Sequence, residues 1–420
     1  MKLSLCSIAV ATLLCTSLMA EVVTEQSIEI TTVRGILGKV EPLEHTTAQL
    51  RAGYIDLNMK GSSTDPDSDA FAVGGHVHLD SKRWYGIMVG AEGYFVEDMG
   101  LQSDNPDKVN GDFFDDGKEG FATLSQAFLD GKWGNTEIKI GRQMIDTPHA
   151  DSDDIRMMPN YFMAYLLTNT DCEGLTLTLG QVDQMAGWEN GVDAKKFVPV
   201  EKVMGSDEKT NGIYLASAIY EGFDNLTLQA WYYDIDDIAD VIYLEAGYEL
   251  PTELATFTFG AQYDTAGERG DEVLGDIDSQ TWGVSLEAAF ENGLMLLTAY
   301  NAAGGDTGAF GSLGGGPFFT SLEDQTLDAV GQKGDAWIAG AGYDFAGLGL
   351  DGLNVGVVYG HFAADESDDY ETAETDIAAE YAIGERFTAT LAYALIDDKT
   401  DADEDYDQFR IILNYNFKAL

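Results

Sequence analysis

The residues with the clearest potential for chemistry lie between positions 145 and 160, where four carboxylates stand close to one histidine and one arginine. Fixed charges of both signs can orient or exclude a charged solute, because facing rows of cations and anions create a transverse electric field. Catalysis requires a nucleophile with a nearby base or a defined carboxylate pair, and none of the five histidines stands in a recognisable nucleophile motif. We therefore expect charge-based selection of a solute, and we expect no enzyme. The acidic residues are Asp146, Asp151, Asp153 and Asp154, and the other two are His149 and Arg156.

Basic residues that could face these carboxylates occur on segments in which apolar and polar residues alternate. Arg51, Lys139 and Arg410 take polar positions, and counting along the segments places Arg51 and Arg410 at comparable depth. Arg142 has the opposite parity and would turn inward only if Gly141 formed a β-bulge. An inward arginine could also serve only to balance carboxylates, and this alternative stays open. We predict that the basic side of a constriction consists of Arg51, Lys139, Arg142, Arg156 and Arg410.

Strands must supply the frame that positions these charges. The last segment is apolar at every second position from Phe409 to Phe417, with polar residues in most of the gaps. A strand with this pattern has one apolar and one polar face. Its repetition along an exported chain is best explained by a transmembrane β-barrel with lipid outside and water inside. The eighteen predicted strands are 46–59, 70–80, 84–97, 120–132, 136–144, 161–168, 174–183, 211–221, 226–236, 240–249, 254–264, 280–291, 294–301, 335–345, 354–363, 375–383, 386–397 and 407–417.

The connections between these strands alternate between short and long. Short ones include 134–135 and 292–293, and long ones include 98–119 and 302–334. Outer-membrane barrels place short turns on the periplasmic side and long loops outside. The sequence therefore predicts an all-β fold, a transmembrane antiparallel up-and-down β-barrel of about 18 strands. Its third long loop carries the charged segment at 145–160, and we expect that loop to fold inward and narrow the barrel.

The N-terminus favours export. Lys2 precedes an apolar run, and Ala20 stands at its end, which is typical of a cleaved secretory signal. Beyond this run no apolar stretch is long enough for a helical membrane span. We therefore expect the protein in the outer membrane of a Gram-negative bacterium. The expected divisions are a signal peptide (1–20), an N-terminal periplasmic segment (21–45), the barrel (46–417) and a C-terminal tail (418–420).

Composition excludes several classes of protein. The 420 residues include 73 acidic and 23 basic ones, for a formal net charge of −50, so nucleic acid is a poor partner. Without the signal peptide, Cys172 is the only cysteine, which excludes an internal disulfide and a cysteine-based zinc site. His76 and His78 share one face of a strand, but two ligands do not make a metal site. We expect no metal and no cofactor.

Partners follow from the distribution of acidic and apolar residues. Acidic residues concentrate in predicted external loops, at 65–69, 112–116, 365–369 and 401–405. A solvated surface is the simplest interpretation, and loosely bound divalent cations that bridge these carboxylates to lipopolysaccharide are the alternative. Aromatic residues near strand ends favour contact with outer-membrane lipids. Monomer and homotrimer both stay open, because an apolar outer face suits a lipid and a second subunit equally.

Two blocks of the sequence look like a known family. The first contains Gly141-Arg142-Gln143, then Thr147-Pro148, then residues 153–159. The second contains residues 304–307, Tyr343 to Gly349, and Tyr359-Gly360. Together they resemble OprD-family outer-membrane porins. The resemblance implies an eighteen-stranded, substrate-selective channel for small charged solutes, with loop three folded inward as a constriction. The chain departs from the family by continuing through 418–420 after the aromatic Phe417.

These observations lead to one function and one alternative. The expected function is that of a porin, a water-filled channel for passive diffusion of small polar or charged solutes such as amino acids, carboxylates and ions. The alternative is a structural or adhesive barrel with an occluded lumen. Net acidity favours cations at the mouth, whereas basic wall residues could admit carboxylates deeper inside, so the charge of the solute stays open.

Overall fold

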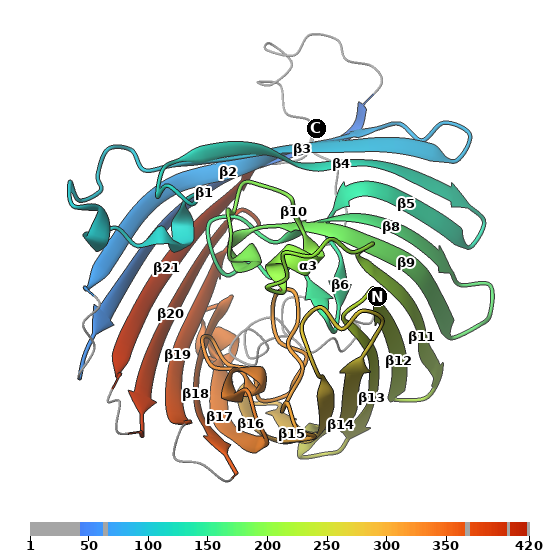
Figure 1. Ribbon diagram of the computed structural model, residues 1–420. Coiled ribbons are helices and arrows are strands. Elements are labelled where there is room, and N and C mark those ends of the chain that lie inside the picture. Colours follow the sequence, from blue (N-terminus) through green and yellow to red (C-terminus); the bar gives the residue numbers. More distant parts are fainter. Residues whose placement is uncertain (1–42, 62–65, 366–369, 401–403, 418–420) are drawn as a thin grey trace.

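The alternating segments form one antiparallel sheet that closes on itself. Strand β1 (Leu43–Met59) pairs on one edge with β2 (Ser68–Ser81) and on the other with β21 (Tyr406–Phe417), so the first and last described strands close the sheet into a barrel (Figure 1). The computed structural model describes residues 43–61, 66–365, 370–400 and 404–417. The predicted signal peptide, residues 21–42 and the tail at 418–420 lie outside the described residues.

Eighteen strands form the barrel wall, as the alternation predicts. Each predicted strand is present, and its ends differ from the observed ends by no more than four residues. After β1 and β2, the wall continues through β3 (Ile87–Glu97), β4 (Phe121–Trp133), β5 (Thr136–Gln143), β8 (Tyr161–Asn169), β9 (Leu175–Ala186), β11 (Ile213–Phe223), β12 (Leu226–Ile235), β13 (Ala239–Pro251), β14 (Ala255–Glu268), β15 (Asp278–Phe290), β16 (Leu294–Gly304), β17 (Gly334–Asp344), β18 (Leu353–Ala364), β19 (Glu371–Ile383) and β20 (Phe387–Asp398).

Short elements occupy the connections. We number the long connections in chain order, so that residues 98–120, 144–160, 187–212 and 305–333 are loops 2, 3, 4 and 7. No helix among the described residues is long and apolar enough to cross a membrane. The short elements are the 3-10 helices η1 (Pro106–Lys108), η2 (Gly111–Phe113), η3 (Trp188–Asn190), η4 (Leu327–Val330) and η5 (Phe345–Leu348), the strands β6 (Asp146–Thr147), β7 (Ala150–Asp151) and β10 (Val198–Pro199), and the helix α3 (Val200–Val203).

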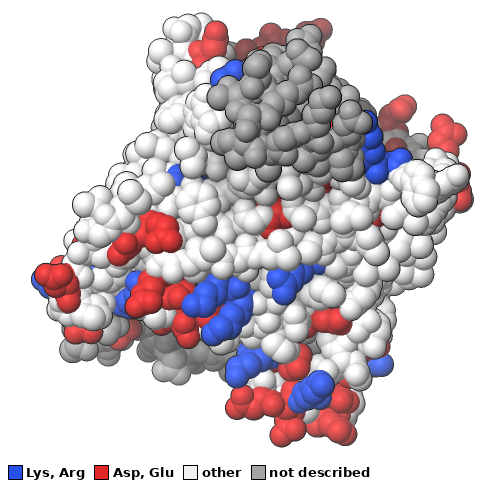
Figure 2. Space-filling model, turned by 90° about the horizontal axis from the view of Figure 1, so that it is seen from above, with Lys and Arg blue, Asp and Glu red and all other residues white. Residues whose placement is uncertain are grey.

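The outer face of the wall is apolar. On β12 and β13, Tyr232, Ile242 and Leu244 are exposed, whereas the intervening Trp231 and Tyr243 are buried inside the barrel. In the outer face that Figure 2 shows, charged side chains gather mostly toward the edges, and a zone of other residues lies across the middle. This two-residue period is what a strand between lipid and the barrel interior requires.

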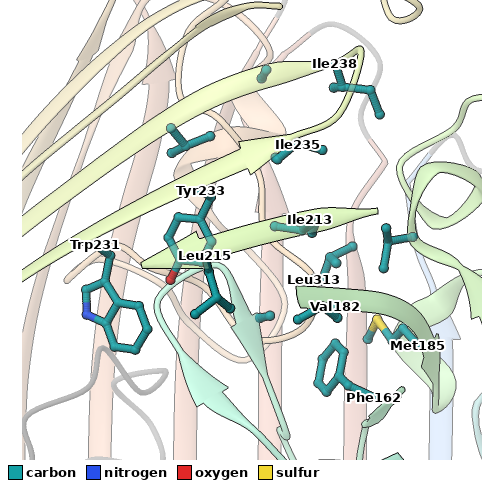
Figure 3. Packing of buried hydrophobic residues seen from close by; sticks show 14 of the residues in the cluster. Phe162, Val182, Met185, Ile213, Leu215, Trp231, Tyr233, Ile235, Ile238 and Leu313 are labelled. Carbon is teal, nitrogen blue, oxygen red and sulfur yellow. The ribbon is translucent and has the colours of Figure 1, made fainter. Parts of the chain in front are cut away.

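Loop 3 folds into the barrel, as predicted, and loops 2, 4 and 7 do so as well. Figure 1 shows β6 of loop 3 and β10 and α3 of loop 4 inside the ring of strands. Their apolar residues pack against apolar residues on the inner wall in three clusters, one of which appears in Figure 3. Burial of apolar surface therefore holds the loops inside. The clusters join Ile145, Ala150 and Leu313 to β8, β9, β11 and β12; Phe318, Leu322 and Leu327 to β16, β17 and β18; and Phe113, Met157 and Ala194 to β1, β2 and β3.

Candidate functional site

Arg51 points from the inner face of β1 into loop 3. Its Nη1 and Nη2 donate to the two carboxylate oxygens of Asp154 at 2.5 and 2.6 Å, and Nη1 also donates to the carbonyl oxygen of Arg156 at 2.9 Å. Its Nε donates to Oδ1 of Asn414 on β21 at 2.8 Å. The two-pronged geometry is the strong form of an arginine–carboxylate contact. Arg51 therefore attaches the tip of loop 3 to the wall beside the closing seam.

The side chain of Arg156 in loop 3 contacts three other loops. Its Nε lies 3.2 Å from Oδ2 of Asp112 in loop 2, and its Nη1 lies 3.5 Å from Oε1 of Glu323 in loop 7. The guanidinium also lies 4.3 Å from the ring centroid of Trp188 in loop 4, a cation–π contact. One loop 3 side chain thus contacts loops 2, 4 and 7.

Arg410 reaches the same group from β21, where it forms an ion pair with Glu323. In the β1–β21 register Arg410 faces Ile55, whereas Arg51 faces Asn414, so the two arginines are four residues apart along the strands. Glu323 nevertheless joins them into one cluster, because it contacts both Arg410 and Arg156. The charges predicted at 51, 154, 156 and 410 are therefore brought together.

The other acidic residues of loop 3 lie beside this cluster. Asp146 faces Asp151 in the β6–β7 pair, and Asp146 is exposed. Burial raises the pKa of Asp151 to about 7, with Asp146 and Glu189 adding to the effect. Burial and the nearby Glu189 also raise the pKa of Asp153 well above its usual value. Part of the acidic charge in loop 3 is therefore titratable near neutral pH.

Two predicted basic residues lie apart from the cluster. Lys139 is inward, as predicted, but it faces Asp130 in the register, and its Nζ lies 4.3 Å from the ring centroid of Phe128. Arg142 lies over the ring of Phe197 at 4.2 Å and donates to the carbonyl oxygen of Leu124. Neither forms an ion pair within the described ranges.

Gly141 does not turn Arg142 inward. Its φ is 125°, and an added Cβ would lie 2.2 Å from the carbonyl oxygen of Ala127, so the position requires glycine. The pairing of β5 with β4 and β8 nevertheless keeps its register throughout. Arg142 therefore retains the parity of the exposed Ile138 and Ile140.

Sequence reasoning missed several residues of the cluster. Glu323, Glu189 and Trp188 stand in loops 4 and 7, which carry no local signal of inward folding beyond their length. Asp112 was assigned to a solvated external loop, whereas it contacts Arg156 inside the barrel. Of the acidic external segments, residues 65, 366–369 and 401–403 lie outside the described residues.

Carboxylates on β19 also bind the backbone of loop 7. Both carboxylate oxygens of Glu374 on β19 accept backbone N–H groups, from Asp324 at 3.0 Å and from Gln325 at 2.7 Å. Asp376 accepts the N–H of Glu323 at 3.1 Å. Loop 7 therefore presents Glu323 from a fixed backbone.

Exposure decides which charges meet water at this site. In the Arg51–Asp154 pair the arginine side chain is 3% exposed and the aspartate 42%. In the Arg156–Asp112 pair the values are 2% and 24%. In both pairs the carboxylate is thus the more accessible member, whereas Arg410 and Glu323 are both buried. Among the described residues no group of three or more His, Cys, Asp or Glu side chains is placed to hold a metal ion.

Comparison with known proteins places this architecture. A family model described as outer membrane porin, OprD family, matches residues 97–419. No curated protein matches the chain significantly in sequence.

Solved structures of three Pseudomonas aeruginosa proteins resemble the chain in fold. OccK9 (OpdG) has 18% identity and a TM-score of 0.78, with 90% of this chain and 98% of that chain covered. OpdK with vanillate has 19% identity, a TM-score of 0.75 and coverage of 90% and 98%. OccK2 (OpdF) in complex with glucuronate has 18% identity, a TM-score of 0.74 and coverage of 90% and 99%.

Proposed function

The chain belongs to the OprD family of outer membrane porins, and we propose that its channel favours small solutes that carry a positive charge. Membership confirms the resemblance predicted from the two sequence blocks, and with it the outer-membrane location, the porin function and the eighteen-stranded barrel.

The observation that supports a positively charged solute is the exposure of the ion pairs inside the barrel. Asp154 and Asp112 are the accessible members of their pairs, whereas Arg51 and Arg156 are almost completely buried. Asp146 adds an exposed carboxylate on the same loop. A permeating ion therefore meets carboxylate oxygens first, and their potential lowers the energy of a cation and raises that of an anion.

A second candidate, an anionic carboxylate, is favoured by basic groups on the wall. His76 and His78 follow Arg51 toward the periplasmic end of β1 and β2, since they face Gln49 and Thr47 in the register. Lys139 also points inward, on β5. Two of the similar structures contain vanillate and glucuronate, which are both carboxylates. A positively charged solute is nevertheless favoured, because Glu92 contacts both histidines and offsets their charge.

Planar-bilayer recordings distinguish these candidates. Stepwise conductance is expected for an open channel, whereas insertion without current would favour the occluded structural barrel. Under a KCl gradient, the sign of the reversal potential should show preference for K⁺. Liposome swelling should then be faster with lysine than with glutamate at equal concentration. A reversal potential of the opposite sign, together with faster swelling in glutamate, would replace the cation proposal by the carboxylate one.

We propose that the chain has no enzymatic activity, in keeping with membership of a family of porins. We also propose that the apolar outer face contacts outer-membrane lipids, and that lipopolysaccharide and loosely bound divalent cations contact the acidic loops. Native mass spectrometry in detergent would separate a monomer from a homotrimer.

A further inference from the structure

His149 connects loop 3, loop 7 and the barrel wall. It lies between β6 and β7, and its side chain is 4% exposed. Its Nε2 lies 2.7 Å from Oδ2 of Asp264 on β14, a residue with 0% exposure. Its Nδ1 lies 3.1 Å from the carbonyl oxygen of Gly311 in loop 7. The two ring nitrogens thus face two different elements.

The carbonyl oxygen of Gly311 and the carboxyl group of Asp264 determine how many protons the His149–Asp264 pair carries. A carbonyl oxygen only accepts hydrogen bonds, so Nδ1 must carry a hydrogen and donate to Gly311. Nε2 then either donates to an ionised Asp264 or accepts from a protonated Asp264. In both arrangements the contact between His149 and Asp264 contains one proton, and the pair has no net charge.

We propose that His149 is a positioning residue whose proton-bearing contact with Asp264 holds loops 3 and 7 against β14 and so maintains the spacing of the charges inside the barrel. The backbone around it supports this role. The N–H of Leu313 donates to the carbonyl oxygen of His149 at 3.0 Å, and the N–H of Asp151 donates to that of Leu313 at 3.0 Å. The two loops therefore form one unit, and the His149 ring attaches that unit to the wall.

Few charged groups compete for this contact. Within the described residues, the ring lies 5.3 Å from that of Tyr233 on β12 and 6.2 Å from that of Tyr243 on β13, measured between centroids. Asp328 in η4 acts on the ring through its charge. The second oxygen of Asp264, Oδ1, is buried and has no hydrogen-bond partner among the described residues. The carboxyl group of Asp264 therefore depends on His149.

Loss of the shared proton would break the contact. Burial alone lowers the pKa of His149, but the charge and hydrogen bond of Asp264 outweigh it, and the pKa is raised. A raised pKa in the folded state means that the contact contributes fully below about pH 6.5, the ordinary histidine value, and is lost as the pH rises through the folded value. Above it, an ionised Asp264 would face the lone pair of a neutral Nε2. We expect the loops to loosen at alkaline pH.

Hydrogen exchange of the full-length refolded porin tests the role directly. In the native protein, exchange at the amides of Asp151 and Leu313, corrected for the intrinsic rate, should accelerate about tenfold between pH 6 and pH 9.5, as loss of a charge-assisted hydrogen bond implies. In Asp264→Asn, the side-chain amide can donate to a neutral Nε2 without a titrating proton. That variant should keep slow exchange at both pH values.

Two further variants complete the experiment. His149→Ala should exchange fast at both pH values, and single-channel recordings should show more frequent current fluctuations. His361→Gln removes a histidine that pairs with Glu371 elsewhere in the barrel and should retain the native pH profile. Native exchange that does not change with pH, or an Asp264→Asn profile equal to the native one, would overturn the proposal. The readout does not depend on which solute permeates, so the solute proposal can fail separately.

Discussion

Replacing Asp154 by Asn tests the acidic surface inside the barrel most directly. Asp154 is the exposed member of its pair with Arg51, so the substitution removes one negative charge where permeating ions pass and leaves a buried arginine in place. For an ion about 6 Å from the lost charge, Coulomb's law in water gives about 0.7 kcal/mol. The effect has opposite signs for a cation and an anion, so the difference is about 1.4 kcal/mol, or about tenfold in the cation-to-anion permeability ratio.

The assay is the reversal potential of single channels in a planar bilayer under a KCl gradient. Asp154→Glu keeps the charge and should retain the native ratio. Glu253→Gln removes an exposed carboxylate at the short turn between β13 and β14, away from the loops, and should also leave the ratio unchanged. If Asp154→Asn conducts normally and its ratio stays within about twofold of the native one, permeating ions do not pass near this carboxylate.

Three further outcomes follow from the same geometry. Arg156→Met should destabilise the arrangement of the loops by about 1–3 kcal/mol, since Asp112 loses its arginine and Glu323 keeps only Arg410. Limited proteolysis should then cleave the loops while the barrel stays intact. Lowering the pH through about 7 should neutralise Asp151 and reduce the preference for cations. Because the pKa of Asp151 is raised in the folded state, the β6–β7 hairpin should lose stability as the pH rises from about 4 to 7. Hydrogen exchange would measure this loss. Glu374→Gln replaces one acceptor of a loop 7 N–H by a donor and should lower the stability of loop 7 by about 1–3 kcal/mol. Hydrogen exchange in loop 7 should become faster, while the thermal midpoint of the barrel stays unchanged.

Much of the fold was accessible from local pattern. The pattern from Phe409 to Phe417 is local, because alternate residues of a strand point to opposite faces whatever the strand pairs with. The same parity placed Arg51 and Arg410 inside, and their buried ion pairs are consistent with it. It also gave Arg142 the parity of the outer side unless Gly141 formed a bulge, and that condition is not met, because the register stays continuous.

The contacts of the charged cluster were not accessible in the same way. Arg51 meets Asp154 across 103 positions of the chain, and Arg156 meets Glu323 across 167. Nothing near these residues in the sequence indicates the partner. Loops 2, 4 and 7 fold inward because their apolar residues match apolar positions on particular strands, as Leu313 does beside β11 and β12. Such a match exists only after the wall has closed.

By itself the sequence determined a barrel, its number of strands, the face on which each strand residue lies and the loop that carries the charges, because a period of two and the length of each connection are properties of neighbouring residues. Only the tertiary structure decided which charge is exposed. Arg51 and Arg156 are covered because loops from distant parts of the chain pack over them, and exposure depends on that packing and not on residue type.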